Sequence, residues 1–205
     1  MAMQIDFRPA GPSDAPFAVP LIHSAGPQAL EYGFSAGVVS ATAFLAFNFP
    51  GSSGFFGYRN HRVAMVDGLI TAIAACYDRN AYRRLSLAHA WLVWRQYPAA
   101  EYVNRMRRGL QLQALMPPPV AGMFYLANFG VTETLRGRGI GRAMLERQIG
   151  AASRAGHDRF ALDVSVENPR ALALYERCGL RVLWRNHFPG PVGAVPDTLR
   201  MELRL

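Results

Sequence analysis

The sequence feature that most constrains the fold is a strand pattern followed by a glycine-rich turn and a helix pattern, within residues 123–155. It begins with the apolar run MFYLANFGV, passes through TLRGRGIG and continues as the helix-forming run RAMLERQIGAASRA. A turn of this kind leaves several backbone N–H groups without partners at the positive end of the helix dipole. The sequence therefore predicts an anion site, suited to a phosphate or pyrophosphate group.

Glycines and arginines alternate in this turn. The glycines let a ligand approach the backbone closely, and the arginines add mobile positive charge around it. These residues are Arg136, Gly137, Arg138, Gly139, Gly141 and Arg142. The spacing differs from the dinucleotide fingerprint G-x-G-x-x-G, because the third glycine comes one position early and position 142 is arginine.

All 22 basic residues are arginine, and the formal net charge is +8. The absence of lysine excludes a Walker-type phosphate loop and a Schiff-base mechanism. Two interpretations of the arginines stay open: a general composition bias, or a partner rich in phosphate or carboxylate groups, which match the guanidinium fork.

The rest of the chain alternates between strand and helix patterns, which predicts a single α/β domain over residues 1–205. A helical hairpin, residues 79–116, is inserted at its middle. The expected strands are 4–8, 61–66, 69–77, 123–131, 159–166, 180–188 and 198–205, and the Asp67-Gly68 pair predicts a tight hairpin turn. The expected helices are 13–23, 27–47, 81–97, 99–115, 141–155 and 168–178.

Several observations bear on the class of protein. Cys76 and Cys178 lie far apart and in no metal-ligand spacing, which favours a reduced protein without a metal site. The start MAMQIDFRPAG has no secretory signal pattern. The uncharged stretch 32–58 has an apolar part, Val38–Phe49, that is too short to cross a bilayer. We therefore expect a soluble, cytoplasmic protein with no membrane partner.

Two motifs carry a resemblance to a known family. RGRGIG resembles the signature R/Q-x-x-G-x-G/A of the GNAT-type acyl-CoA N-acyltransferase superfamily, with Arg136, Gly139 and Gly141 in the defining places. NPRALALYERCGL resembles the second motif of that superfamily, N-x-x-A-x-x-L-Y-x-x-x-G-F. The matching residues are Asn168, Ala171, Leu174, Tyr175 and Gly179, and Leu180 stands where phenylalanine is usual.

The resemblance implies a mixed, mostly antiparallel sheet of about seven strands, splayed between the fourth and fifth and flanked by helices. It implies acetyl-CoA as the acyl donor and no metal. The pyrophosphate would lie on the amides of Arg138, Gly139, Ile140, Gly141 and Arg142. The pantetheine arm would lie along Phe129, Gly130 and Val131, with Asn168 and Ala171 on its other side.

The resemblance also implies catalytic roles. Tyr175 would protonate the leaving thiolate. Spacing alone favours a tyrosine packed on the sheet, and the surrounding motif favours the catalytic role. The base that deprotonates the amine would be Asp163 or Glu133, and deprotonation through water without a dedicated base stays open. RNHFP, residues 185–189, resembles the RNYYP segment of the branch that acetylates peptide N-termini, with His187 and Phe188 in place of two tyrosines.

The favoured function is therefore transfer of an acetyl group from acetyl-CoA to a primary amine of a small molecule or peptide. A non-catalytic acyl-CoA-binding regulatory module and an arginine-rich nucleic-acid binder are the alternatives, and no nucleic-acid partner is expected. A homodimer stays open. The inserted hairpin and the residues around Tyr32, Phe34, Trp91 and Trp94 would border the acceptor. We expect His61 and His157 in turns and His89 in the packing of the hairpin.

Overall fold

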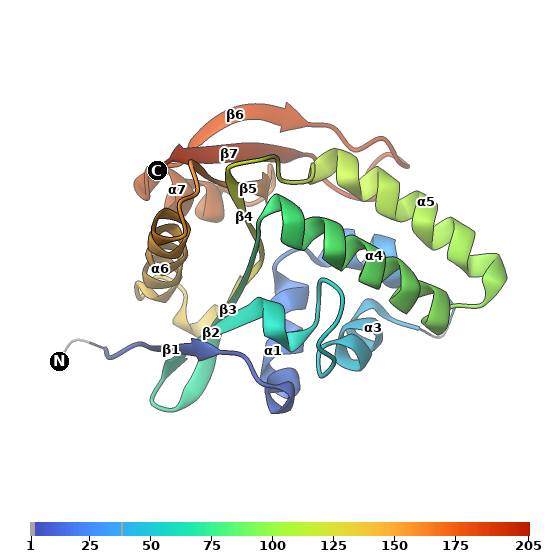
Figure 1. The fold of residues 1–205 in the computed structure, drawn as a ribbon, viewed down its shortest axis with the longest axis horizontal. Helices are drawn as coiled ribbons and strands as arrows, with labels where there is room; N and C mark the ends of the chain where they lie inside the picture. The colour runs from blue at the N-terminus through green and yellow to red at the C-terminus, as the bar shows by residue number, and fades with distance from the viewer. Residues whose placement is uncertain (1–2, 38) are drawn as a thin grey trace.

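A computed structural model describes residues 3–37 and 39–205 as a seven-stranded sheet covered by helices on both faces (Figure 1). Met1, Ala2 and Val38, which belong to the predicted chain start and second helix, lie outside the described residues. The strand order is β1-β2-β3-β4-β5-β7-β6. The strands are β1 (Asp6–Pro9), β2 (His61–Val66), β3 (Leu69–Tyr77), β4 (Met123–Val131), β5 (Arg159–Ser165), β6 (Arg181–Asn186) and β7 (Thr198–Arg204).

Neighbouring strands are antiparallel except β4 and β5, which are parallel. The predicted fold class, a mostly antiparallel mixed sheet flanked by helices, is therefore confirmed. The parallel pair needs a crossover, and helix α6 (Ile140–Arg154) supplies it between the end of β4 and the start of β5.

The helices divide between the two faces of the sheet (Figure 1). Helices α6 and α7 (Pro169–Arg177) cover one face. The other face carries α1 (Ala15–Ser24), α2 (Pro27–Phe34), α3 (Ala41–Asn48), α4 (Arg79–Gln96) and α5 (Ala99–Leu115). Short 3₁₀ turns lie at Pro12–Asp14, Tyr58–Asn60 and Glu133–Leu135. No helix of the described residues is long and apolar enough to cross a bilayer.

Strand β3 shows why both faces are apolar. Ala72 and Ala74 point to the α6 side, and Ile73, Ala75 and Tyr77 point to the α1 and α4 side. Because successive side chains of a strand alternate between faces, a strand covered on both sides is a continuous apolar run rather than an alternating one.

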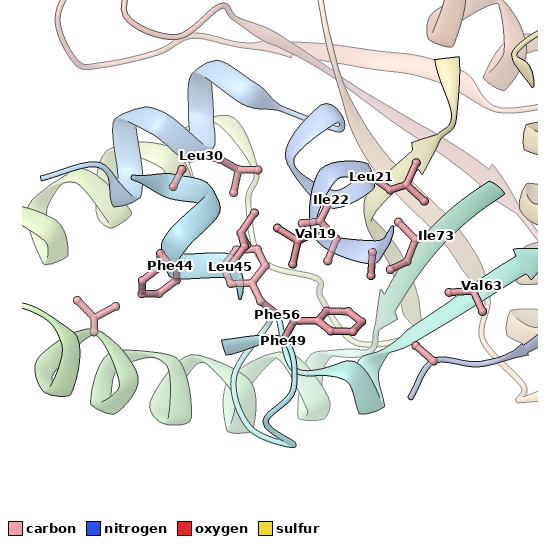
Figure 2. Close-up of a cluster of buried hydrophobic side chains, with 14 of the residues drawn as sticks. Val19, Leu21, Ile22, Leu30, Phe44, Leu45, Phe49, Phe56, Val63 and Ile73 are labelled. Atoms are coloured by element: carbon pink, nitrogen blue, oxygen red, sulfur yellow. The ribbon is translucent and has the colours of Figure 1, made fainter. Parts of the chain in front are cut away.

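The larger core on the α1 side is aromatic. Figure 2 shows Phe44, Phe49 and Phe56, from α3 and the loop after it, packed toward Ile22 of α1 and Ile73 of β3. His89 of α4 lies with its ring 5.5 Å from Phe34 and 5.9 Å from Phe44. His89 is therefore a packing residue of the hairpin, as predicted, and its burial lowers its pKa to about 4.

The glycine signals at chain reversals are confirmed. Asp67 and Gly68 have φ values of 50° and 78°, which the primed hairpin turn between β2 and β3 requires. Gly156 and Gly179, directly after α6 and α7, have φ values of 76° and 91°. Such left-handed residues end helices, and glycine adopts this conformation without a Cβ penalty.

The single helix predicted over 27–47 is wrong, because the structure has two helices there, α2 and α3. The chain leaves the helix at Ser35, whose hydroxyl accepts a hydrogen bond from Ala41 N (3.0 Å). Ser40 then caps α3 by accepting from Ala43 N (3.1 Å). These two serine hydroxyls satisfy backbone groups that a continuous helix would have paired internally.

The helical hairpin expected at 79–116 is present as α4 and α5. Arg105 of α5 is 5 % exposed and donates hydrogen bonds to the carbonyl oxygens of Gly33 (3.4 Å) and Ser35 (2.6 Å) at the end of α2. Gln96 and Asn48 exchange hydrogen bonds of 3.0 Å and 3.2 Å between α4 and α3. The hairpin is therefore held by polar side chains at both helices.

Candidate active site

Strands β4 and β5 separate after three paired residues. Pairing stops at Tyr125 and Ala161, while β4 continues to Val131 in contact with β3 alone. Gly130 pairs with Ile73 and Ala127 pairs with Ala75, so β4 advances by three residues where β3 advances by two. This extra residue is a bulge in β4. This geometry matches the predicted splay between the fourth and fifth strands and leaves one edge of β4 without a strand partner.

A buried histidine fixes the bulge. Asn128 has a φ of 51°, and its amide nitrogen contacts His61 Nε2 at 3.1 Å. His61 Nδ1 lies 3.0 Å from the carbonyl oxygen of Gly57, which can only accept, so Nδ1 carries the proton and Nε2 accepts from Asn128. Burial lowers the pKa of His61 to about 4, so the ring is neutral near pH 7.

The expectation that His61 lies in a turn is wrong. It is the first residue of β2 and is 1 % exposed. His157, in contrast, lies between α6 and β5, as expected of a turn residue, and stacks on Phe124 with ring centroids 4.8 Å apart.

Helix α1 closes the other side of β4. A Cβ atom on Gly130 would collide with the backbone carbonyl of Leu21, so only glycine allows this close approach. At the end of the strand, the Val131 carbonyl oxygen accepts a hydrogen bond from Arg136 Nε (3.2 Å) rather than from a strand. The free edge of β4 therefore faces the gap toward β5.

The glycine-rich turn leads directly from this edge into α6. Gly137 and Gly139 have φ values of 87° and 86°, and Gly139 is the residue before the first turn of the helix. Nothing lies within 4 Å of the position a Gly139 Cβ would occupy. The turn thus presents open backbone at the N-terminus of a 15-residue helix, which is the arrangement an anionic group requires.

Gly141 and Arg142 lie in the first turn of the helix. The position of a Gly141 Cβ lies 3.4 Å from Val131 and Leu174 and 3.7 Å from Phe129, so α6, α7 and β4 meet there. Arg142 pairs with Glu146 one helical turn later, at 2.7 Å. Both side chains of this ion pair are solvent-exposed, which leaves the guanidinium able to reorient.

The second motif forms the start of α7. Asn168 caps the helix by accepting from Ala171 N (3.0 Å). Arg170 points back toward the turn, with its Nη2 3.3 Å from the position of a Gly137 Cβ. The two predicted motifs, about 30 residues apart in the chain, therefore lie side by side.

Tyr175 is buried on α7 at 7 % exposure, with its ring 6.3 Å from that of Phe129. Burial raises the pKa of its hydroxyl above the usual value, so the phenol stays protonated at neutral pH. Among the described residues, Arg105 Nε is the one fully enclosed side-chain nitrogen or oxygen without a hydrogen bond. Among the described residues the Tyr175 hydroxyl has no hydrogen-bond partner either, so it can still form a hydrogen bond with a ligand.

Asp163 does not fit the predicted role of a base. Its side chain is 0 % exposed and forms an ion pair with Arg200 at 2.8 Å. Tyr125 (2.8 Å) and Asn186 (3.0 Å) donate further hydrogen bonds to it, so each carboxylate oxygen accepts two. Burial raises the pKa of Asp163, and the hydrogen bonds and charge of Arg200 oppose that rise. A carboxylate so enclosed has no free position for a proton from an amine.

Glu133, the other predicted base, has a different environment. Its side chain is 87 % exposed, and its nearest charged partner is Arg136 at 3.8 Å. Together they line a shallow pocket with Phe17 and Ser24 of α1 and Val131 of β4. Glu133 is therefore accessible, at the end of the strand whose edge is free.

Residues 111–180 match the model of the family described as Acetyltransferase (GNAT) family, which spans both motifs and the splayed strand. The match covers 70 of the 205 residues, and over this part the chain is similar to the GNAT family.

Solved structures share the GNAT fold over nearly the whole chain. An N-acetyltransferase of Staphylococcus aureus Mu50 is 15 % identical, with a TM-score of 0.68 over 97 % of this chain and 100 % of that one. The Salmonella typhimurium protein yncA, solved with its cofactor acetyl-CoA, is 17 % identical, with a TM-score of 0.56 over 98 % of this chain and 94 % of that one.

Sequence similarity to curated relatives is local. The mycothiol acetyltransferase of Beutenbergia cavernae is 41 % identical over 64 residues, which are 31 % of this chain and 21 % of the relative. That of Jonesia denitrificans is 40 % identical over 65 residues. The chain thus spans about a fifth of the length of the curated relatives it matches.

Three residues of this candidate site were not predicted from the sequence. Arg170 follows the Asn-Pro start of the second motif, so its place in the first turn of α7 was a readable signal for an anion contact. Asn128 carried a weaker signal, since asparagine tolerates a left-handed φ better than most residues. Nothing in the sequence identified Arg200 as the partner of Asp163, because the two lie 37 residues apart.

Among residues 3–37 and 39–205, no group of three histidine, cysteine, aspartate or glutamate side chains is arranged to hold a metal ion.

Proposed function

We propose that the chain is an acetyl-CoA-dependent N-acetyltransferase, which transfers the acetyl group to a primary amine that attacks the thioester directly. One observation carries the proposal: the free edge of β4 leads directly into an open, glycine-lined helix N-terminus, with Tyr175 of α7 next to Phe129 of that strand. A ligand that has an amide-bearing arm and a pyrophosphate at one end fits this arrangement: the arm would lie along the strand edge and the pyrophosphate at the helix N-terminus.

The residues present fit acetyl-CoA. Backbone amides at positions 138–142 would hold the pyrophosphate, and the open space at Gly139 admits it. Arg138, Arg142 and Arg170 would add charge-assisted contacts. Backbone groups of Phe129, Gly130 and Val131 would pair with the amides of the arm as another strand does, and Asn168 with Ala171 would border the arm from α7. Arg136, now on the Val131 carbonyl oxygen, would release it.

Acetyl-CoA supplies the acyl group as a thioester, which a neutral amine nitrogen attacks with release of the CoA thiol. The protein would protonate the departing sulfur through Tyr175, whose raised pKa keeps its proton available at neutral pH. A backbone N–H at the β4 bulge would stabilise negative charge on the thioester oxygen, a contribution of roughly 2.7–4 kcal/mol in comparable sites. The His61–Asn128 contact holds that bulge in place.

An alkylamine must lose a proton before it attacks, because its pKa of about 10.4 keeps it charged near pH 7. Glu133 is accessible and lies next to the end of β4, so we assign it the base role, with water relaying the proton to the carboxylate. Asp163 instead acts as the counterion of Arg200.

The comparisons support the donor more than the acceptor. The fold is shared with yncA, which was solved with acetyl-CoA. Both curated relatives are named mycothiol acetyltransferases, so an acceptor of such an enzyme belongs among the first amines to test. We treat residues 1–205 as one catalytic domain, with α4 and α5 inserted in it, working in the reducing cytoplasm, where Cys76 and Cys178 would stay free.

The test is a screen of primary amines, from small metabolites to peptides with free N-termini, with acetyl-CoA as donor and CoA thiol release as the readout. We expect one amine class to give release that depends on both substrates, with the acetylated amine confirmed by mass. Binding of acetyl-CoA without turnover of any amine would instead favour a non-catalytic acyl-CoA-binding module. Retention on DNA that acetyl-CoA does not compete away would favour the nucleic-acid alternative.

A further inference from the structure

The positive charge of the chain is concentrated in the inserted hairpin. Residues 79–115 contain seven arginines and one glutamate, so they carry a net charge of +6 out of the +8 of the whole sequence. The one glutamate, Glu101, is paired with Arg105 inside the hairpin at 3.2 Å. The outer surface of the hairpin is therefore a cationic face.

The same face is apolar along α4. Leu87, Trp91 and Trp94 are 77 %, 51 % and 61 % exposed. Their spacing of four and then three residues places them on one stripe of the helix. The stripe is about 10 Å long from Leu87 to Trp94, at a rise of 1.5 Å per residue.

Arginines flank this stripe, and α4 contains no acidic residue. Arg83 and Arg84 precede it, and Arg95 follows it with its guanidinium 4.7 Å from the centre of the Trp91 ring. All three are exposed. We call Arg83, Arg84, Leu87, Trp91, Trp94 and Arg95 the outer face of α4.

The fold does not need this face for its core. Helix α4 packs inward through Tyr82 and Leu85, against Phe55 and the sheet, and through the buried Val93. Two tryptophans and a leucine that stay more than half exposed on one stripe form an apolar patch, and such a patch on a surface is typical of an interaction site.

We propose that the outer face of α4 docks the protein on an anionic lipid surface. A bilayer surface supplies both groups that this face requires: an apolar boundary for Leu87, Trp91 and Trp94, and anionic headgroups for the arginines. Tryptophan and arginine side chains each place an apolar body below the headgroups and a polar end among them. A helix with this composition lies flat in the interface rather than crossing it.

Two other occupants fit less well. Nucleic acid would pair with the arginines but leaves Leu87 and Trp94 without an apolar partner. A second copy of the chain would cover the apolar stripe but would bring two hairpins of charge +6 together. The inference is independent of the proposed transferase activity, and it revises the expectation that the chain has no membrane partner.

The test is co-sedimentation of the full chain with vesicles of phosphatidylcholine alone and of phosphatidylcholine mixed with phosphatidylglycerol. We expect binding to the mixed vesicles only, weakened by added salt. Replacing Arg83, Arg84 and Arg95 by glutamine should weaken partitioning by about 100-fold, since each arginine near the surface contributes about fivefold. The triple variant Leu87→Ser, Trp91→Ser and Trp94→Ser should abolish vesicle binding. Its circular dichroism spectrum should match that of the wild type, which shows that the fold is kept.

Matched controls separate this face from overall charge and hydrophobicity. Arg154→Gln, Arg177→Gln and Arg181→Gln together remove the same charge from exposed positions elsewhere, and Phe47→Ser removes a side chain that is 65 % exposed on α3. Both control variants should bind the mixed vesicles with an affinity close to that of the wild type. No binding to either vesicle, or equal loss in the controls, would overturn the proposal. So would a concentration-dependent dimer, or binding to DNA, that the α4 variants abolish while vesicle binding is unchanged.

Discussion

Tyr175 and Glu133 occupy opposite environments at the residue scale, and these suit opposite proton transfers. Tyr175 is buried beside Phe129, and its pKa is raised by that burial, so it holds a proton to give. Glu133 is exposed beside Arg136, so its carboxylate can accept one through water. A pair of groups that differ in this way is typical of acid–base catalysis.

Tyr175→Phe removes the hydroxyl and keeps the ring that contacts Phe129. Stability and acetyl-CoA affinity should stay near wild type, and turnover should fall by roughly 10²–10⁴-fold, the usual range for a positioned acid. The loss should lie in kcat rather than KM, since the proton moves only in the transition state. Steady-state kinetics with the amine found in the screen measure it. Unchanged turnover, where chemistry limits the rate, would make Tyr175 a packing residue.

His61 predicts a pH dependence of stability. Its folded pKa of about 4 lies below the unfolded value of about 6.5, so the unfolded chain binds the extra proton as the pH falls. The stability that neutral His61 provides is therefore complete above pH 6.5 and is lost progressively between pH 6.5 and 4. From pH 6.5 to 5 the contribution to this loss is about 2 kcal/mol.

Urea unfolding at these two pH values measures the effect in wild type and in His61→Gln. The variant keeps a polar side chain but has no titrating group. Between pH 6.5 and 5 its free energy of unfolding should therefore fall by about 2 kcal/mol less than that of the wild type. Parallel losses in the two proteins would show that His61 is charged in the folded state or is not buried.

At the element scale, one ion pair joins strands on the far side of the splay to the hairpin. Arg200 of β7 bonds Asp163 of β5 and also donates to the carbonyl oxygen of Pro117 (2.8 Å), just after α5. Asn186 of β6 donates to the Leu115 carbonyl oxygen (3.1 Å) as well as to Asp163. The pair therefore links β5, β6 and β7 to the end of the insertion.

Asp163→Asn should leave the Arg200 charge buried without a counterion, which costs about 3–5 kcal/mol of stability. The pH profile of turnover in the folded enzyme should be unchanged, because Asp163 does not take the amine proton. Chemical unfolding and a pH–rate profile at low temperature measure the two effects. If Asp163→Asn does not fold, Asp163→Asn with Arg200→Gln removes both charges and allows the profile to be recorded. A loss of activity concentrated at low pH would restore the base role of Asp163.

Local signals in the sequence were sufficient for the elements around the turn. The apolar run 123–131 is β4, and the glycine turn opens α6 within one residue of the predicted start. The break between α2 and α3 was missed although Gly37, which has a φ of 54°, lies within it, and the break also depends on hydroxyl contacts of Ser35 and Ser40.

The parts of the site that were missed depend on contacts between distant residues. His61 looked like a turn residue because the Asn128 amide that bonds it lies 67 residues away. Asp163 looked like a base because Arg200, in the alternating run TLRMELR, has the pattern of an exposed residue yet is 2 % exposed. Periodicity identifies which face a residue lies on, but it does not identify the partner that neutralises a buried charge.

At the scale of the whole molecule, the two proposed functions lie on two sides of one chain. The splayed sheet and the turn before α6 are the proposed site of the acyl donor, and the hairpin that covers the opposite face of the sheet carries most of the charge (Figure 1). Because the two sides share no residue, binding of acetyl-CoA and binding of lipid can be measured separately.

The central claim is that acetyl-CoA binds at the turn before α6, and thermal unfolding with and without acetyl-CoA tests it most directly. At 100 times its Kd the ligand should add about 2.7 kcal/mol, which raises Tm by about 5–10 °C in a chain of this size. Gly139→Glu should abolish the shift by placing a carboxylate where the pyrophosphate lies. Gly156→Glu is the matched control, since Gly156 also has a positive φ and open space around it, at the far end of α6, and it should keep the full shift. A wild-type Tm that millimolar acetyl-CoA leaves unmoved, or an equal shift in Gly139→Glu, would contradict the account.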